Sequence, residues 1–234
     1  MTKHATYHNL RDAMKKPGCF VCRLTNEMVD RYLDMFLYEN VNDVDVRRDL
    51  RESNGFCPTH ARQLREHGDP LGHSIIYVDL IDGVLDSLRS LLASHLHPSG
   101  KLTISQVRRL VPGQECPACC VARESQERYV AVLLEELTSD PLFEMEFAAS
   151  SGLCLSHLAR ALEVSRNAET ARRLLRVSIG KLEELKTHLG EVIRKHDYRF
   201  SKEPWGDEKD AWIRATQVWS GLPQTALPTA PPHG

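Results

Sequence analysis

The chain has 234 residues, of which 26% are charged, and its formal net charge at pH 7 is −2. That length is enough to bury a core in one large domain or in two small ones, and the near-neutral charge gives no reason to expect a nucleic acid or an anionic membrane as partner. Because no apolar run approaches the about 18 residues of a membrane span and the first residues lack the apolar core of a signal peptide, we expect a cytoplasmic protein.

The first half of the chain predicts a long helix, a short helix and a second long helix. Residues 23–40 carry apolar side chains at helical spacing, at Leu24, Met28, Tyr32 and Phe36. Residues 44–53 form a shorter helical pattern, which we expect to bring the chain back towards its start. A glycine and an aspartate then provide a stop and an N-cap, and the helix that begins at Pro70 keeps its leucines at helical spacing as far as Leu96.

The second half predicts the same succession. Residues 121–140 repeat the long helical pattern, and Pro141 begins a short helix that extends to residue 150. Asn167 then caps a further long helix. No stretch shows two-residue alternation of apolar and polar side chains bounded by turn signals. The sequence therefore predicts an all-α fold, a helical bundle in which one long helix closes each half.

After residue 196 the sequence has no counterpart in the first half. All three tryptophans lie here, at positions 205, 212 and 219. The spacing of seven places Trp212 and Trp219 on one face of a helix, and we expect residues 197–222 to form a helical segment that docks this aromatic face across the bundle. Residues 223–234 are rich in proline and small side chains, and we expect them to be a disordered tail.

The cysteines reveal an internal repeat. Cys116, Cys119 and Cys154 lie 97 positions after Cys19, Cys22 and Cys57, and the same offset relates His157 to His60 and Gly152 to Gly55. Each half therefore reads Cys-x-x-Cys, then 34 residues, then Cys-x-x-His. Agreement of such rare residue types at one offset indicates a tandem duplication with a unit of about 97 residues, over residues 1–97 and 98–196.

These motifs suit metal binding. Two thiolates separated by two residues can clamp one ion from a tight turn, and a Cys and a His three positions apart project from one face of a helix towards the same ion. The glycine that opens "GFCPTH" and "GLCLSH" lets the chain turn into that helix, whose N-terminal dipole favours the neighbouring thiolate. We expect one site in each half, with the ligands Cys19, Cys22, Cys57 and His60 in the first and Cys116, Cys119, Cys154 and His157 in the second.

Three Cys and one His complete a tetrahedral zinc shell, which is typical of structural rather than catalytic zinc. Zinc is therefore the metal that we expect at both sites. An iron–sulfur cluster is a less favoured alternative, because it more often takes four Cys at other spacings. A redox dithiol, or cysteines that pack in the core without a metal, are further alternatives. Cys120 has no counterpart in the first half, and we interpret it as a core or surface thiol, with a role as an alternative ligand left open.

A second candidate site follows the second repeat. His196, Asp197, Tyr198 and Arg199 are consecutive polar side chains. They form either a capping and hydrogen-bonding corner or a polar site for a ligand or for catalysis. Consecutive residues on a helix point about 100° apart, which counts against a compact catalytic group.

Several of these motifs together resemble an uncharacterised bacterial family, a domain of unknown function. The resemblance rests on "CPAC", "GFCPTH", "GLCLSH" and the late "KHDYRF" segment at residues 195–200, followed by Trp212, Ala215 and Gly221. It covers nearly the whole chain apart from the tail. The first cysteine pair departs from the second in carrying Phe20 where the second carries Pro117, which leaves the ligands intact. The resemblance implies no activity.

The hypothesis that follows is a zinc-stabilised helical protein without enzymatic activity, which binds another macromolecule or a small ligand. One alternative is a redox- or metal-responsive thiol protein, and another is an enzyme that uses residues 196–199. Nucleic-acid binding is a minor alternative, which a basic surface formed by Arg47, Arg48, Arg108 and Arg109 would favour. The sequence assigns neither the partner nor the oligomeric state.

Overall fold

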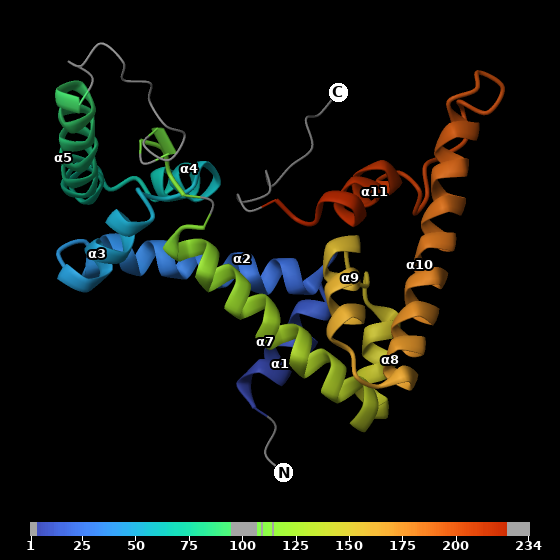
Figure 1. The fold of residues 1–234 in the computed structure, drawn as a ribbon. Helices are drawn as coiled ribbons and strands as arrows, with labels where there is room; N and C mark the ends of the chain where they lie inside the picture. The colour runs from blue at the N-terminus through green and yellow to red at the C-terminus, as the bar shows by residue number, and fades with distance from the viewer. Residues whose placement is uncertain (1–3, 95–106, 109, 114, 224–234) are drawn as a thin grey trace. The chain divides into compact units, whose positions relative to one another are not determined.

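The computed structural model describes residues 4–94, 107–108, 110–113 and 115–223 (Figure 1). The regular structure of these residues is helical, with no strand among them, which confirms the predicted all-α class. Within this described part, no helix combines the length and the apolar character needed to cross a membrane. The chain divides into two compact units, which we call unit 1 (residues 1–25 and 125–234) and unit 2 (residues 26–124). These units differ from the predicted repeats over 1–97 and 98–196, since unit 1 takes segments from both.

The predicted helices of the first half are present. They are α2 (Phe20–Met35), a π-helical turn η1 (Phe36–Asn40), α3 (Val44–Glu52), α4 (Pro58–Glu66) and α5 (Pro70–Ser94). The Asp43 side chain caps α3 by accepting hydrogen bonds from the backbone N–H groups of Asp45 and Val46. Leu96, to which we expected the last of these helices to extend, lies outside the described residues.

Unit 2 has its own apolar core. Its buried members include Val29, Leu33, Phe36, Leu50, Phe56, Leu64 and Ile76. The rings of Phe36 and Phe56 meet edge to face with centroids 5.1 Å apart. Helix α5 contacts α3 and η1, and the Asp79 carboxylate on α5 accepts hydrogen bonds from Arg47 and Arg51 of α3. The beginning of α5 is thereby fixed to the rest of this unit.

Unit 1 contains the helices from both ends of the chain. They are α1 (Ala5–Met14), most of α7 (Pro117–Ser139), α8 (Pro141–Ala149), α9 (Leu155–Val164), α10 (Ala168–Lys195) and α11 (Ala211–Ser220). Helix α1 contacts α8, where Arg11 forms an ion pair with Glu146 and the Tyr7 hydroxyl donates to Asp140 over 2.9 Å. Phe20 and Phe147 pack edge to face in the buried interior of this unit.

The helices of the two halves begin at matching positions. Helices α3 and α8 begin at residues 44 and 141, and α4 and α9 begin at residues 58 and 155, so both pairs keep the offset of 97 that relates the cysteines. The N-cap aspartates Asp43 and Asp140 also keep it. Each half of the sequence therefore supplies the same succession of long helix, short helix, Cys-x-x-His helix and long helix.

Helix α11 contacts α9 and α10, but it does not dock through its tryptophans. Trp212 is 61% exposed and Trp219 is 70% exposed, whereas Ala211 is fully buried. The expectation that the aromatic face packs across the bundle is therefore wrong. The spacing of seven identified residues that share a face, but the small side chain of Ala211, about 100° away around the helix, allows a different face to approach the neighbouring helices closely.

Candidate metal centres

The eight predicted ligands lie in two clusters of four. Cluster A consists of Cys19, Cys22, Cys154 and His157, and cluster B consists of Cys57, His60, Cys116 and Cys119. Cluster A lies in unit 1 and cluster B lies in unit 2. In each cluster the four ligand atoms all lie within 4.8 Å of one another. Both clusters can therefore hold a metal ion.

The pairing of the motifs differs from the predicted one. Each cluster takes its Cys-x-x-Cys motif from one half of the sequence and its Cys-x-x-His motif from the other, so the expectation of one site within each half is wrong. The reason lies in helix length. The 16 residues of α2 and 5 of η1 carry the chain roughly 30 Å away from Cys22, and the 9 residues of α3 return it by only about 13 Å. Each Cys-x-x-His motif therefore stays far from the cysteine pair of its own half.

The Cys-x-x-Cys motifs stand at the beginning of long helices. The backbone carbonyl of Cys19 accepts from Arg23 N–H, and that of Cys116 accepts from the N–H groups of Cys119 and Cys120. These bonds form the first helical turn, in which side chains three positions apart lie on the same face. The turn therefore directs both thiols of a pair to one side.

The Cys-x-x-His motifs stand at helix N-termini, as the sequence predicted. Cys57 and Cys154 are the N-cap residues of α4 and α9, with extended backbone conformations. The preceding glycines turn the chain into these helices with left-handed φ values, 95° at Gly55 and 77° at Gly152, which a residue with a Cβ adopts only under strain.

Cluster A is buried at all four ligands. The His157 Nδ1 atom lies 3.4 Å from Cys19 Sγ, 3.3 Å from Cys22 Sγ and 3.2 Å from Cys154 Sγ. The sulfurs of Cys22 and Cys154 are 3.6 Å apart. One imidazole nitrogen thus faces three sulfurs, although a histidine nitrogen makes a single conventional hydrogen bond.

Cluster B repeats this geometry with two partly exposed members, Cys57 and Cys119. The His60 Nδ1 atom lies 3.3 Å from the sulfurs of both Cys57 and Cys116 and 3.4 Å from that of Cys119. Cys119 Sγ is 3.6 Å from Cys116 Sγ and 3.7 Å from Cys57 Sγ. The Nε2 atom of His60 is buried without a hydrogen-bond partner in the described part of the chain.

These separations fit a tetrahedral shell of zinc size. Zinc bonds of about 2.3 Å to sulfur and about 2.0 Å to nitrogen place two sulfurs about 3.8 Å apart and a sulfur and a nitrogen about 3.5 Å apart in a tetrahedron. The observed sulfur pairs lie 3.6–3.7 Å apart. A disulfide, in contrast, requires about 2.05 Å between its sulfurs.

The protonation of the ligands in cluster A is strongly coupled. Hydrogen bonds from Cys19 and Cys22 lower the pKa of the Cys154 thiol. The hydrogen bond between Cys22 and Cys154 in turn raises the pKa of the Cys22 thiol. Burial opposes a charged His157, but its interactions with Cys154 and Cys19 raise its pKa to about 9. Several buried thiolates cannot share one site without a compensating cation, and a divalent ion would supply that charge.

In cluster B, burial and hydrogen bonds again act in opposite directions on the pKa values of the ligands. Burial alone would raise the pKa of Cys57, but the backbone N–H groups of His60 and Thr59 at the start of α4 outweigh burial and lower it. Burial and the neighbouring Cys116 thiol raise the pKa of Cys119 to about 12, despite the opposing backbone N–H. Burial also lowers the pKa of His60, which keeps the imidazole in the neutral form that a metal requires.

Gly221 lies directly beside cluster A. A Cβ at this position would lie 3.0 Å from Cys22 Sγ and 3.8 Å from Cys154 Sγ, and the backbone has a φ of 75°. Leu222, next in the chain, is buried and would contact a Cβ at Gly18, next to Cys19. The end of α11 therefore covers cluster A. No sequence pattern predicted a structural role for this glycine, which was named only as part of the family resemblance.

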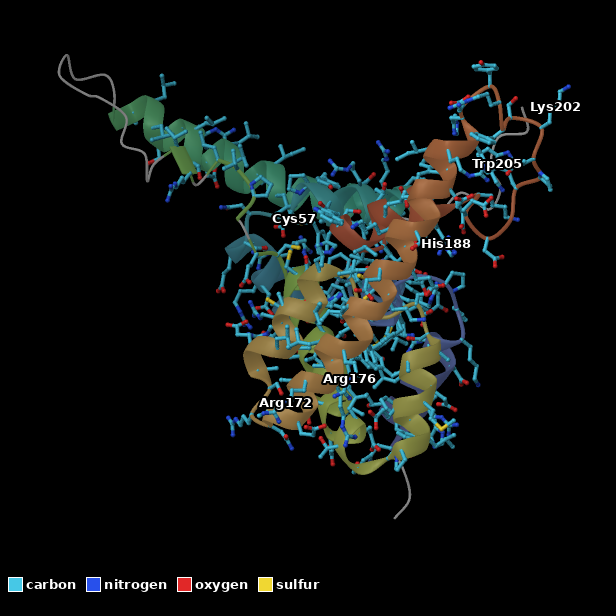
Figure 2. The ribbon with its side chains drawn as sticks, turned by 90° about the vertical axis from the view of Figure 1, so that its right-hand side faces the viewer. Cys57, Arg172, Arg176, His188, Lys202 and Trp205 are labelled. Carbon is cyan, nitrogen blue, oxygen red and sulfur yellow. The ribbon has the colours of Figure 1, made fainter. Side chains whose placement is uncertain are left out.

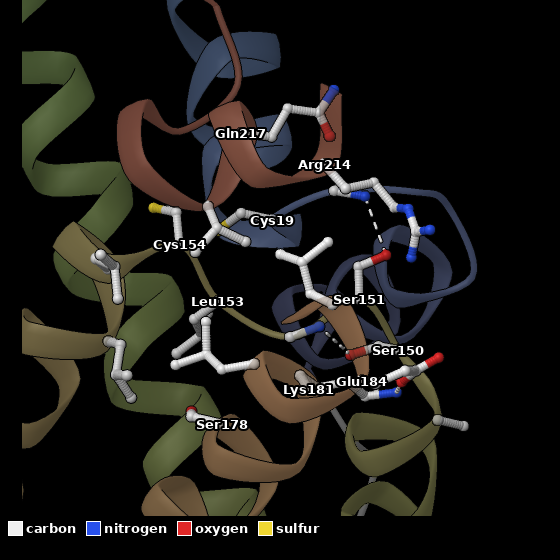
Figure 3. Close-up of a pocket in the computed structure, with 18 residues that line it drawn as sticks. Cys19, Ser150, Ser151, Leu153, Cys154, Ser178, Lys181, Glu184, Arg214 and Gln217 are labelled. Carbon is white, nitrogen blue, oxygen red and sulfur yellow. Dashed lines mark hydrogen bonds and ion pairs between the residues drawn. The ribbon is translucent and has the colours of Figure 1, made fainter. Parts of the chain in front are cut away.

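A cavity of about 230 Å³ adjoins cluster A (Figure 3). Cys19 and Cys154 lie at one end, while Lys181 and Glu184 lie at the other. Its remaining wall is mixed. The apolar side chains include Leu153, Leu155, Leu158, Leu182, Leu185 and Val218, and the polar ones are Ser150, Ser151, Ser178, Arg214 and Gln217. No sequence motif marks this cavity, because its lining comes from four separate segments of the chain.

The four residues of the second candidate site do not converge. They follow the end of α10, which Figure 2 shows running from Arg172 past His188 towards the loop with Lys202 and Trp205. His196 Nδ1 bonds to the Val192 carbonyl over 2.8 Å, and its ring packs 5.7 Å from that of Trp205. Asp197 pairs with Arg199 over 2.7 Å, and Tyr198 is 86% exposed. This arrangement is the capping and hydrogen-bonding corner rather than a cleft.

Cys120 is partly exposed and belongs to neither cluster in the described part of the chain. Its side chain therefore provides a matched control for substitutions of the ligand cysteines.

The fold and the clusters together define a class, an all-helical protein with two Cys₃His clusters that can each hold a metal ion. Residues 1–225 match a family described as a family of unknown function (DUF6062), and the chain belongs to this family. The chain is also 33% identical over 209 residues to the "Uncharacterized 23.9 kDa protein in xynA 3'region" of Caldicellulosiruptor sp. (strain Rt8B.4), covering 88% of this chain and 97% of that protein. No solved structure matches the chain. The predicted resemblance to a family of unknown function is confirmed.

Proposed function

We propose that this is a zinc-binding protein in which both Cys₃His clusters are structural sites, and that it acts by binding a partner rather than by catalysis. The observation that carries the proposal is that each cluster provides four ligand atoms at separations that suit tetrahedral zinc. A shell filled by four protein ligands leaves no position for water or substrate, which is typical of structural zinc. Three Cys and one His also suit zinc better than an iron–sulfur cluster, which more often takes four Cys.

Each ion would join segments that are remote in the sequence. Cluster A connects the start of α2 to the start of α9, and cluster B connects the start of α4 to the start of α7. Closing such long loops costs only a few kcal/mol of chain entropy, whereas a structural zinc site can supply on the order of 10 kcal/mol. The role of the ions is then to hold two halves of the sequence in one fold.

Metal analysis of protein purified without added metal tests the proposal. We expect two zinc ions per chain, and one after either Cys22→Ser in cluster A or Cys57→Ser in cluster B. Cys120→Ser is the control and should retain both ions. Iron in place of zinc, or protein that folds fully without any metal, would contradict the proposal.

The cavity beside cluster A supports the small-ligand form of the binding hypothesis, because it combines apolar side chains with the charged groups of Lys181, Glu184 and Arg214. Nucleic-acid binding receives less support. Arg47 pairs with Asp79, and Arg48 pairs with acidic residues of its own helix. Arg109, the last member of the expected basic surface, lies outside the described residues.

A redox- or metal-responsive role is the second candidate, and the difference in exposure between the clusters favours it. Cys57 and Cys119 in cluster B are partly exposed, whereas every ligand of cluster A is buried. Peroxide would oxidise two thiolates to a disulfide while it is itself reduced to water, with release of the ion. Stepwise peroxide treatment should then release one zinc before the other, and first from cluster B. Release of both ions together, or of neither, would count against this role.

We also infer that the two halves arose by duplication, because the helix starts, N-caps and ligands share one offset. The proposed location is the cytoplasm, because thiolates must stay reduced to hold their metal.

A further inference from the structure

Helix α5 carries apolar side chains on two opposite sides. Ile76 is 2% exposed and faces the core of unit 2, where Leu80 also packs. The other side carries a row that we call the α5 seam, formed by Leu71, Val78, Ile81, Leu85, Leu88 and Leu92. At about 100° per residue, this row points away from Ile76 by roughly half a turn. A helix that is apolar on both sides is typically covered on both.

The α5 seam follows the coiled-coil repeat. From Val78 to Leu92 its members are separated alternately by three and four residues, the a and d positions of consecutive heptads. These side chains are between 39% and 69% exposed. With Leu71 the seam covers three heptads, or about 32 Å of helix, which is the length at which a heptad pattern becomes indicative of a coiled coil.

The corresponding positions of the second long helix face a cavity that α11 helps to line. The positions 97 residues after Leu85 and Leu88 are Leu182 and Leu185 on α10. These leucines line the cavity together with Gln217 of α11, and α11 contacts α10. The tryptophan-bearing segment that forms α11 is not repeated in the first half of the sequence. Within the described part of the first half, no helix corresponds to α11.

We propose that the α5 seam pairs with the α5 seam of a second copy of this chain as an antiparallel two-helix coiled coil. The heptad row is self-complementary, because its leucines, Ile81 and Val78 can interdigitate with those of the second copy across a two-fold axis. The α5 seam contains no ligand of either cluster, and the proposal does not depend on the identity of their metal.

The charges beside the seam select the antiparallel orientation. Asp82 and Arg89 flank it on one edge, whereas the other edge carries the apolar residues Tyr77, Val84 and Leu91. In an antiparallel pair each edge faces its own counterpart, so Asp82 of one copy lies near Arg89 of the other, twice per dimer. A parallel pair would instead place both charges against the apolar edge. Within the chain, Arg89 forms a highly exposed ion pair with Asp86. Such a pair contributes little stability, so Arg89 can give it up to pair with Asp82 of the second copy.

Sedimentation equilibrium of the metal-loaded full chain, over a concentration series that reaches about 100 μM, tests the dimer. We expect a dimer, and we expect Ile81→Glu to weaken it by at least about a hundredfold, because a carboxylate would be buried without a partner. The control is Ile179→Glu, because Ile179 on α10 has the same 54% exposure as Ile81. It should leave the dimer unchanged. A monomer over the whole series, or a dimer that Ile81→Glu does not weaken, overturns the proposal.

A charge exchange tests the orientation. Asp82→Arg and Arg89→Asp should each weaken the dimer about tenfold or more, because they place like charges opposite each other. The double variant Asp82→Arg/Arg89→Asp should restore wild-type affinity. All three variants should keep the wild-type metal content, which excludes a folding defect. Single variants that dimerise like the wild type would overturn the antiparallel arrangement.

Discussion

At the scale of the residue, Gly221 connects the last helix to the metal chemistry. A Cβ there would press on Cys22 Sγ at 3.0 Å, and its φ of 75° is unfavourable for any residue with a side chain. Gly221→Ala should therefore weaken metal binding at cluster A by about 10- to 100-fold, the range seen when groups that support a metal ligand are altered. Competition with a chromophoric chelator measures this affinity, with one strong and one weakened site expected.

Gly68→Ala separates the effect of backbone strain from the effect of contact with Cys22. Gly68 has a similar φ of 70°, but a Cβ there would have no neighbour within 4 Å. It should cost about 1–2 kcal/mol of stability through backbone strain alone and leave both metal affinities unchanged. If the two glycine variants changed the metal affinity of cluster A equally, the effect of Gly221→Ala would not arise from contact with Cys22.

Glu208 fixes the loop that follows α10. It accepts hydrogen bonds from Gly206 N–H and from the Lys195 ammonium, and these interactions lower its pKa to about 2. A carboxyl with a lowered pKa stabilises the fold above its ordinary pKa, and that contribution is lost only as the pH falls towards the folded value. Glu208→Gln should therefore speed tryptic cleavage at Lys202 by the same factor at pH 6 and pH 8.

Glu163→Gln is the control for this loop. Glu163 pairs with Arg160 at an exposed position on α9, so the variant should leave cleavage at Lys202 unchanged. An effect of Glu208→Gln that doubles or vanishes between pH 6 and pH 8 would contradict the assignment of the lowered pKa.

At the scale of the element, the two aspartate caps differ in a bond to a neighbouring helix. Asp43 and Asp140 both accept two backbone hydrogen bonds at a helix start, but Asp140 also accepts from the Tyr7 hydroxyl. Asp43→Ala should cost about 1 kcal/mol. Asp140→Ala should cost about 2 kcal/mol, because a further hydrogen bond of about 1 kcal/mol is lost.

Thermal unfolding of the metal-loaded protein measures both cap variants. Tyr7→Phe should be less destabilising beside Asp140→Ala than in the wild type, since the bond that the two residues share is lost only once. An equal cost for the two aspartate substitutions would show that the bond to Tyr7 contributes nothing.

The helices could be predicted from the sequence because their signals are local. Apolar periodicity gave α2 and α7, and the capping residues gave the starts of α5, α8 and α10. The docking side of α11 could not be predicted, because Trp212 and Ala211 differ in exposure for reasons of packing rather than of periodicity. Apolar character alone does not tell which side of a helix a neighbour will cover.

The ligands could likewise be predicted, but not their pairing. Every member of clusters A and B followed from one offset and from the chemistry of thiolates and imidazole. The pairing depends on how far each helix carries the chain, and a short return helix such as α3 cannot cancel the length of α2 with η1. The predicted helices over residues 23–40 and 44–53 differ in length in the same way, so helix length is the one sequence signal that bears on the pairing.

At the scale of the whole molecule, the central claim is that each metal site joins the two halves of the sequence. Two double variants test it directly through the zinc content of the purified protein. Cys19→Ser with His157→Ala removes two ligands of cluster A and should leave one zinc per chain, held by cluster B. Cys19→Ser with His60→Ala damages both clusters and should leave none. The opposite result, with one zinc in the second variant and none in the first, would show that each half binds its own metal and would contradict the account.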